Sequence, residues 1–286
     1  MISAREIAAW RAHAPWSSDV KVEQDYLMCK AVAAIFEDKF LSSQVAMRGG
    51  TVLHKGHLAP AARYSEDIDL VRVGNRPASH LKKALARVLR PLLGEPSESI
   101  YTSITLAVRN LSLKSKIIRS TYVYDPWSPE ATFAKLKVEI NTNETQSLYP
   151  LVPVAVEVPN EAGAVRAVSV RSYDPDEMLG TKMRALLQRE HGRDLFDLWR
   201  AWECSKASTT RRPNPARVGE AFRFYMTREG SRFSSAQYRD ELSRRMQSRK
   251  FLRDLEGYLP IGTDYDPQAA YVTFCEIFLP HLDAAP

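Results

Sequence analysis

Two adjacent glycines and a pair of aspartates constrain this chain more than any other feature. Sixteen residues separate Gly49 and Gly50 from Asp67, and Asp69 follows two positions later, within RGGTVLHKGHLAPAARYSEDIDLVRV. Apolar residues before the glycines predict a short strand, and TVLHKGHL after them predicts a helix. The segment EDIDLVRV predicts a second strand that carries both acids.

The aspartate pair predicts a divalent-cation site. Residues two apart in a strand point to the same face, so Asp67 and Asp69 project together while Ile68 and Leu70 point into the core. Neighbouring carboxylates raise each other's pKa, and a cation removes that penalty. Magnesium prefers hard oxygen ligands together with substrate phosphates, and manganese is an alternative. An exposed strand edge is the competing interpretation, and the apolar residues around the acids disfavour it.

The glycine pair predicts a phosphate contact. Glycine has no Cβ, so Gly49 and Gly50 allow the backbone to approach a ligand closely. The helix that begins there offers free N–H groups to phosphate. A glycine pair before a helix is more often simple turn chemistry, but glycines and acids in this order indicate a nucleoside triphosphate with its magnesium.

Size and composition predict an ordinary soluble globular protein of one large or two smaller domains. The chain has 286 residues, of which 44% are hydrophobic and 26% charged. No apolar run approaches the ~20 residues of a membrane span, and the first residues do not resemble a secretory signal. We therefore expect no membrane contact and a cytoplasmic location. Cys29, Cys204 and Cys275 lie far apart, which indicates reduced, buried thiols and no zinc site.

Basic charge is concentrated in the C-terminal third. Residues 211–253 contain twelve basic and four acidic residues, a net charge of +8, whereas the remaining 28 basic and 30 acidic residues give −2. This segment is a candidate RNA-binding surface. The residues that we expect to contact RNA are Arg211, Arg212, Arg223, Arg244, Arg245, Arg249 and Lys250. A solvated arginine-rich helix face, with Phe222, Phe224, Tyr225, Phe233 and Tyr238 in the core, is the alternative.

The patterning along the chain predicts an α+β fold with a mixed or antiparallel sheet. Three strands, YTSITLAVRN, SKIIRSTYVYD and ATFAKLKVEINT, read as antiparallel neighbours, and AVSVRS reads as a further strand. Helices are expected at 3–14, at 22–40, from Ala78 to a stop near Pro91, from Asp174 or Asp176 to about Arg189, from Arg193, and at 215–228, 235–249 and 268–282. The connector SKASTTRRPNP divides a domain at 1–203 from a helical, basic part at 214–286.

Two further regions carry candidate site residues. Glu139 alternates with Val138 and Ile140, so it is either a third metal-binding carboxylate or merely exposed. Lys182 and Arg189 share a helix face, and Asp194 and Asp197 share one on the next helix. Either Lys182 contacts the triphosphate while the arginine–aspartate cluster orients it, or Arg189, Arg193 and the two aspartates form a surface ion-pair network.

Four blocks resemble the motifs of the AbiEii/AbiGii-type nucleotidyltransferase toxins, a family of the polymerase-beta-type superfamily that includes the MenT-like toxins. They are GGTVLHK (49–55), RYSEDIDL (63–70), KMRALLQR (182–189) and RDLFDLW (193–199). The resemblance implies a polymerase-beta-type core and a toxin that is controlled by a cognate antitoxin. It also implies a magnesium-dependent enzyme that transfers nucleotides from an NTP to the 3′ end of tRNA and so blocks translation.

Carried over residue by residue, the resemblance assigns roles to the four blocks. Gly49, Gly50 and Thr51 would cradle the triphosphate, and Asp67 and Asp69 would ligate magnesium. Lys182 would contact phosphate, and Asp194 or Asp197 would complete the site. The remaining residues that we expect at the nucleotide are Arg48, Arg63, Ser65, Arg189 and Arg193. The chain departs from the minimal superfamily pattern by a short insertion, GHLAPAAR, between the glycines and the aspartates.

Two other functions stay open. The same fold could transfer a nucleotide to a protein hydroxyl, although the basic C-terminal segment favours RNA. The second possibility is that the chain is a catalytically inactive module that binds RNA or the antitoxin. The complete acid pair together with Lys182 disfavours this possibility. Ser65 suggests regulation, because a phosphate there would add about −1.5 to −2 charges beside the acid pair. We expect such a modification to inhibit the enzyme.

Overall fold

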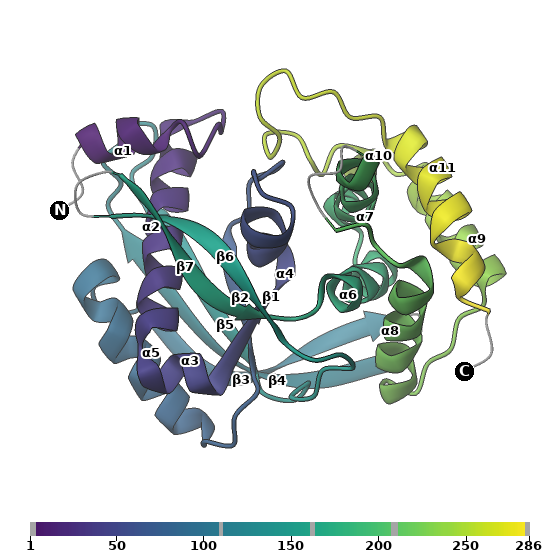
Figure 1. Ribbon diagram of the computed structural model, residues 1–286, viewed down its shortest axis with the longest axis horizontal. Coiled ribbons are helices and arrows are strands. Elements are labelled where there is room, and N and C mark those ends of the chain that lie inside the picture. Colours follow the sequence, from purple (N-terminus) through teal and green to yellow (C-terminus); the bar gives the residue numbers. More distant parts are fainter. Residues whose placement is uncertain (1–3, 109–110, 161–163, 207–210, 284–286) are drawn as a thin grey trace.

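A mixed seven-stranded sheet forms the centre of the chain (Figure 1). The computed structural model describes residues 4–108, 111–160, 164–206 and 211–283, with backbone alone at 103–108 and 111–115. The strand order is β3-β4-β5-β2-β1-β7-β6. The bounds are β1 Val45–Arg48, β2 Asp67–Arg72, β3 Glu98–Val108, β4 Leu111–Tyr124, β5 Ala134–Asn141, β6 Val152–Pro159 and β7 Val165–Ser172. The pairs β2–β5 and β1–β7 are parallel and the others antiparallel, so the predicted α+β class is confirmed.

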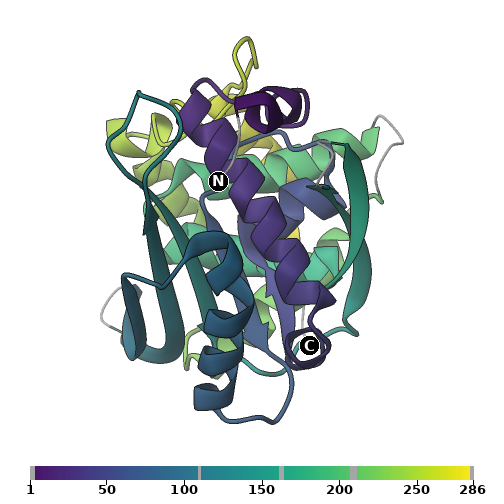
Figure 2. The ribbon, with the colours of Figure 1, turned by 90° about the vertical axis from the view of Figure 1, so that its left-hand side faces the viewer.

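Helices α2 (Asp19–Glu37) and α5 (Ala78–Leu93) cover one face of the sheet (Figure 2). Their apolar sides are buried, as the side chains of Leu81 and Leu85 illustrate. The helix expected at 22–40 divides at Asp38, whose carboxylate caps the next helix, α3 (Lys39–Gln44). The N-terminal helix α1 (Ala4–Trp10) packs against α2.

The C-terminal helices pack together on the other side of the molecule (Figure 1). Their bounds are α6 Pro175–Gln188, α7 Gly192–Lys206, α8 Pro215–Arg228, α9 Ser235–Arg245, α10 Arg249–Leu252 and α11 Pro267–Ile277. Helix α6 packs against both α7 and α8, and α11 packs against α7. The contact between α6 and α8 is close, because a Cβ added at Gly180 would lie 2.6 Å from the Cβ of Ala221. Residues 207–210 of the predicted connector lie outside the described part, and the domain division stays a prediction.

Several other elements differ from the sequence-based prediction, and among them α1 ends at Trp10 rather than at 14 and α11 ends at Ile277 rather than at 282. Strand β6 was not predicted, because prolines at 153 and 159 break the usual strand signal; it lies at the edge of the sheet, where proline is tolerated. Helix α5 continues through Pro91 and ends before Gly94, which has a φ of +73°. Helix α9 ends at Arg245, before the expected end at 249, and the short α10 follows.

The cysteines are buried, as the sequence predicted. Cys29, Cys204 and Cys275 are buried free thiols. Within the described ranges, every helix is too short or too polar to cross a membrane.

Candidate functional site

The glycine turn lies directly over side chains of the site itself. Strand β1 leads into α4 (Gly49–Val52), which continues as a π-helical turn at Leu53–His57. Gly49 has a φ of +86°, and a Cβ added there would lie 2.3 Å from Oδ2 of Asp69. A Cβ at Gly50 would lie 2.7 Å from Nη2 of Arg63. Glycine is therefore required at both positions, because Asp69 and Arg63 occupy the space that a larger residue would fill.

Asp67 and Asp69 lie on β2 beside β5, the strand that was predicted from ATFAKLKVEINT. Ile68 between them is fully buried, as predicted. In the parallel pairing of β2 with β5, Asp67 lies opposite Lys137 and Asp69 lies opposite Glu139. Nζ of Lys137 lies 2.8 Å from Oδ2 of Asp67. The acid pair thus has one ammonium partner from β5.

Burial and like charge make Asp67 reluctant to ionise. Its pKa is raised to about 6, first by burial and then by the charge of Asp69, while Lys137 offsets part of the rise. A second cation beside the pair would relieve this repulsion. The observation fits the predicted cation site, because the anions are crowded more strongly than one lysine can neutralise.

A polar cleft brings together residues from all four sequence blocks. It is lined by Gly50, Arg63, Ser65, Glu66, Asp67, Asp69, Lys182, Arg189 and Arg193. Eight of these nine are residues that the sequence predicted for the nucleotide or the catalytic site, and Glu66 is the addition. The cleft combines acids on β2 with cations from the loop before it and from α6 and α7. Such an arrangement suits a cation–polyphosphate complex.

Beneath the cleft, a buried ion-pair cluster holds the phosphate-side cations in place. Nε and Nη2 of Arg63 donate to the Asp197 carboxylate at 2.6 and 2.7 Å. Nζ of Lys182 lies 2.8 Å from Asp197 Oδ2 and 3.1 Å from Asp194 Oδ1. Arg189 donates to Asp194 through Nε and Nη2, at 2.8 and 3.0 Å. The two aspartates therefore act as anchors for the three cations.

The charges in this cluster support each other. Burial alone would raise the pKa of Asp197, but Arg63 and Lys182 more than offset it and hold the pKa well below its usual range. Burial lowers the pKa of His54, whose Nε2 lies 2.8 Å from Asp197 Oδ1, to about 4. This histidine is neutral at pH 7. The carboxylates of the ion-pair network are buried rather than on the surface, and Arg193 pairs with Asp254 instead of with these two aspartates. The contact of Lys182 with a triphosphate stays a prediction.

The donor set fits magnesium through two carboxylates. In the part of the chain that the structure describes, no group of three or more His, Cys, Asp or Glu side chains lies close enough to hold a metal ion. Glu139 is bound by Arg119, whose Nε lies 2.7 Å from its Oε1. Magnesium is commonly held by one or two carboxylates together with water and substrate phosphates, so Asp67 and Asp69 suffice. Glu139 as a third ligand stays a prediction.

Some predicted nucleotide-binding residues contact the protein rather than the cleft. Arg48 forms an ion pair with Glu144. The buried hydroxyl of Thr51 donates to the carbonyl oxygen of Asp67 at 2.6 Å and lies 2.8 Å from the Ser65 hydroxyl. These bonds tie the start of α4 to the start of β2. Ser65 itself lines the cleft, and its modification stays a prediction.

The predicted RNA-binding residues are dispersed, and several stabilise the fold. Three of them form ion pairs: Arg211 with Asp174 and Asp176, Arg244 with Glu241, and Lys250, at 3.8 Å, with Glu190. Arg223 donates to the carbonyl oxygen of His281, and Arg245 donates to carbonyl groups at the end of α6. Arg212 lies over the ring of Trp202, and Arg249 is exposed. The aromatic residues Phe222, Tyr225 and Tyr238 are buried, as the alternative interpretation expected.

Sequence reasoning did not identify three residues that shape the site. They are Lys137 beside Asp67, Glu66 in the cleft wall and His54 beneath it. Alternation with Glu139 placed Lys137 on the correct face of its strand. The register of β5 against β2, which brings it to Asp67, had no signal in the sequence.

The raised pKa of Asp67 predicts how stability depends on pH. The folded chain binds this proton more tightly than the unfolded chain, whose aspartates titrate near 4. The contribution of Asp67 to stability is therefore present below about pH 4 and is lost as pH rises through about 6. We expect Asp67→Asn to be more stable than wild type at pH 7.5 by about 1 kcal/mol, a discounted value because a third of the side chain is exposed.

Urea denaturation in a chelating buffer checks this prediction. The difference between Asp67→Asn and wild type should be largest at pH 7.5 and should shrink toward pH 4.5. A variant that is less stable than wild type at pH 7.5 would show that Asp67 is held by favourable contacts and does not suffer net repulsion.

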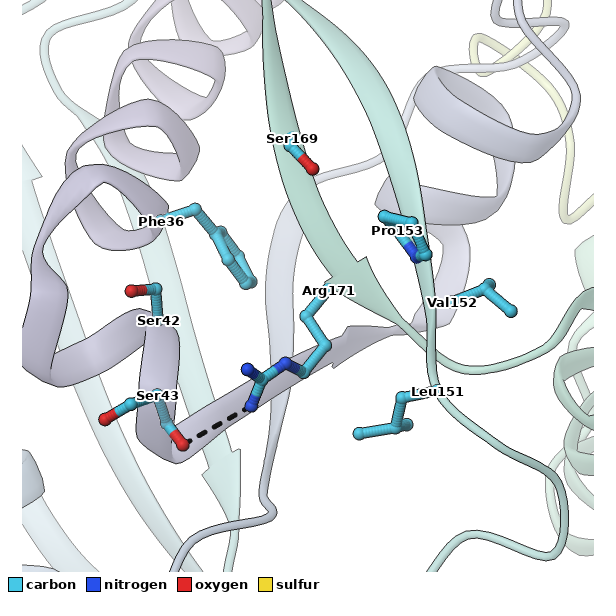
Figure 3. Close-up of a pocket in the computed structure, with 8 residues that line it drawn as sticks. All are labelled: Phe36, Ser42, Ser43, Leu151, Val152, Pro153, Ser169 and Arg171. Atoms are coloured by element: carbon cyan, nitrogen blue, oxygen red, sulfur yellow. Dashed lines mark hydrogen bonds between the residues drawn. The ribbon is translucent and has the colours of Figure 1, made fainter.

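A second, roomier groove lacks the chemistry of the cleft (Figure 3). It lies between the end of α2, α3 and the β6–β7 pair, and it measures about 390 Å³. Its lining includes Ser43, Pro153 and Arg171, and Nη1 of Arg171 lies 3.4 Å from the carbonyl oxygen of Ser43. Without a carboxylate pair, this groove offers no cation site.

Comparisons with known proteins agree with the geometry of the cleft. A family model described as "Nucleotidyl transferase AbiEii toxin, Type IV TA system" matches residues 30–277. A comparison with curated proteins found no match.

Two solved structures are similar to this chain. MenT4, nucleotidyltransferase toxin Rv2826c from Mycobacterium tuberculosis H37Rv, is 14% identical with a TM-score of 0.56, over 99% of this chain and 91% of that one. This likeness shows that the two chains share a fold. The CdnE cyclic dinucleotide synthase of Elizabethkingia meningoseptica, solved with GTP and Apcpp, is 10% identical over 99% of this chain and 100% of that one, with a TM-score of 0.26.

Proposed function

The chain belongs to the AbiEii nucleotidyltransferase toxin family of type IV toxin–antitoxin systems, and from this membership we propose that it transfers nucleotides from an NTP to the 3′ end of tRNA. The observation that carries the proposal is the cleft in which Asp67 and Asp69 face Lys182 and Arg189. A product of this kind blocks translation. The proposal therefore places the active toxin in the cytoplasm, beside its antitoxin.

In this scheme the residues divide into two groups. Arg63, Lys182 and Arg189, with Arg193, receive the triphosphate and neutralise the charge that develops during transfer. Asp67 and Asp69 would hold magnesium, which would supply electrostatic stabilisation of the phosphates and the leaving group. The anchors Asp194 and Asp197 keep the cations oriented, so they act through Lys182, Arg189 and Arg63.

The support for RNA as the acceptor is electrostatic. The +8 charge of residues 211–253 favours a polyanion, although several of these cations have protein partners. RNA held through phosphates should bind more weakly as salt increases, by roughly one log unit of affinity per log unit of salt for each phosphate contact. An acceptor that is a protein hydroxyl would show little of this dependence.

Labelled nucleotides test the proposed reaction. The protein is incubated with each α-³²P-labelled NTP, total tRNA and magnesium, and the products are separated on denaturing RNA and protein gels. We expect label on tRNA. Periodate oxidation of the tRNA, which destroys the 3′-terminal diol, should abolish labelling, whereas tRNA carried through the same treatment without periodate should be labelled. Label on protein alone would replace the proposal with protein nucleotidylation, and no label would indicate an inactive module.

A further inference from the structure

The cleft has two flanks, and only one of them faces the triphosphate side. The glycine turn follows β1, and the anchored cations Lys182 and Arg189 come from α6 and its end, which follow β7. In the sheet order β5-β2-β1-β7, the strands that lead into these elements lie on the β1 side of the aspartates, although α6 itself also packs against β3. An acceptor that attacks the triphosphate must approach from a different side. The amino-terminal end of β5 is a candidate approach, because the strands that lead to the glycine turn and to α6 lie on the other side of the aspartates.

On the side of the sheet where Asp67 lies, the start of β5 is exposed and carries cations next to an aromatic ring. Ala134 and Leu136 point into the core, so Lys135 and Lys137 point to the side of the aspartates. Nζ of Lys137 contacts Asp67, which confirms this orientation. Phe133 precedes the strand, and its ring lies beside the ammonium of Lys135. Helices α2 and α5 cover the opposite face of the sheet (Figure 2). We call Phe133, Lys135 and Lys137 the β5 platform.

Phe133 is a large apolar residue, and 55% of it is exposed. The ammonium of Lys135 lies 5.4 Å from the centre of its ring. Lys135 forms no ion pair with a residue of the described ranges, so its charge is available to a phosphate. On the neighbouring strand β4, Val123 lies opposite Lys135 and is 40% exposed, which extends the surface.

We propose that the β5 platform binds the single-stranded 3′ end of the acceptor RNA, with a base stacked on Phe133 and the phosphates beside Lys135. The inference rests on the proposed function and adds the path of the acceptor. Exposed aromatic faces next to cations are the usual platform for single-stranded nucleic acid. Phe133 and Lys137, which lies opposite Asp67, are four residues apart on or next to one strand. This separation is about 13 Å, the length of about four stacked nucleotides.

The aromatic residues of the C-terminal basic segment are buried or half-buried, including Phe224, which lies beside Arg228, whereas Phe133 is exposed. Phe222 and Tyr238 of that segment are buried, so their faces cannot stack on a base. Nη2 of Arg245 donates to the carbonyl oxygen of Leu187 at 2.6 Å, which fixes it to the end of α6. The segment suits phosphates of a duplex stem better than an unpaired end.

Acidic residues near the platform leave this preference unchanged. Glu139 is paired with Arg119. Glu98 lies on the outer strand β3, opposite Thr121 of β4, so that β4 separates it from β5. Asp125 and Glu130, in the loop before Phe133, are exposed, and within the described ranges neither forms an ion pair with Lys135.

Steady-state kinetics separate the acceptor from the nucleotide. For Phe133→Ala and Lys135→Ala, we expect the KM for tRNA to rise by about 5- to 100-fold, the effect of losing one stacked base or its neighbouring cation, while the KM for NTP stays within twofold of wild type. Phe133→Trp should retain acceptor binding. The matched controls are Tyr101→Ala and Lys83→Ala, an exposed aromatic and an exposed lysine on the opposite face of the sheet and on α5, and neither should change either KM.

Direct binding gives a readout that does not depend on turnover. A fluorescein-labelled 12-nucleotide single strand with a free 3′ end should bind wild type more tightly than a blunt hairpin of the same composition, by fluorescence anisotropy, and Phe133→Ala should remove the difference. If wild type labels tRNA but Phe133→Ala matches it in KM and in binding, the platform is refuted and the proposed function stands. If wild type neither labels nor binds RNA, both are refuted.

Discussion

Asp69→Asn is expected to reduce nucleotidyl transfer by at least about a thousandfold, or about 4 kcal/mol of transition-state stabilisation, and to leave the fold intact. Asp69 shares a face of β2 with Asp67, and its carboxylate occupies the space that a side chain at position 49 would need. The amide cannot supply the negative charge that a magnesium site needs. Because the substitution also removes the like charge that raises the pKa of Asp67, urea stability should be unchanged or slightly higher.

Rates with labelled NTP and tRNA, circular dichroism and urea titration together test this result. The matched control is Asp240→Asn, an exposed aspartate of α9, which should match wild type in all three measurements. Wild-type activity in Asp69→Asn would overturn the assignment of the acid pair. Lost activity accompanied by lost structure would instead show that Asp69 stabilises the fold.

The sequence was sufficient where the chemistry is local. Alternation within one strand placed Asp67 and Asp69 on a common face, and the burial of Ile68 and Leu70 confirms it. Asp174 was one of two expected helix starts, and its side chain caps α6 by accepting a hydrogen bond from the backbone N–H of Asp176. These features depend on residues at most a few positions apart, so periodicity and capping rules predict them.

Contacts between distant segments were beyond the sequence. Arg63 reaches Asp197 across 134 positions, and Lys137 meets Asp67 only through the parallel register of β2 and β5. Nothing in the composition of either segment specifies such a pairing, because register is set by the packing of the whole sheet. For the same reason, the aromatic residues among the C-terminal arginines were ambiguous until the packing of α8 and α9 placed Phe222 and Tyr238 in the core.

Asp197→Asn is expected to destabilise the folded chain by about 3–5 kcal/mol, because it leaves buried cations without their anion. The carboxylate accepts two hydrogen bonds from Arg63 and lies 2.8 Å from Nζ of Lys182, and it is fully buried. In a chain of this size the melting temperature should fall by roughly 10 °C. Asp194→Asn should weaken NTP binding more directly, because Asp194 orients the half-exposed Arg189.

The two aspartates thus have distinguishable signatures, which resolves an assignment that the sequence left open. Urea denaturation should show the larger loss of stability for Asp197→Asn, whereas the rise in KM for NTP, measured under conditions where each variant is folded, should be clear for Asp194→Asn. The double variant Arg63→Met with Asp197→Leu should recover part of the stability lost in Asp197→Asn, because it removes the unpaired charge of Arg63 together with the carboxylate. Equal stability of Asp197→Asn and wild type would mean that the cluster beneath the cleft is not what holds Arg63 and Lys182 in place.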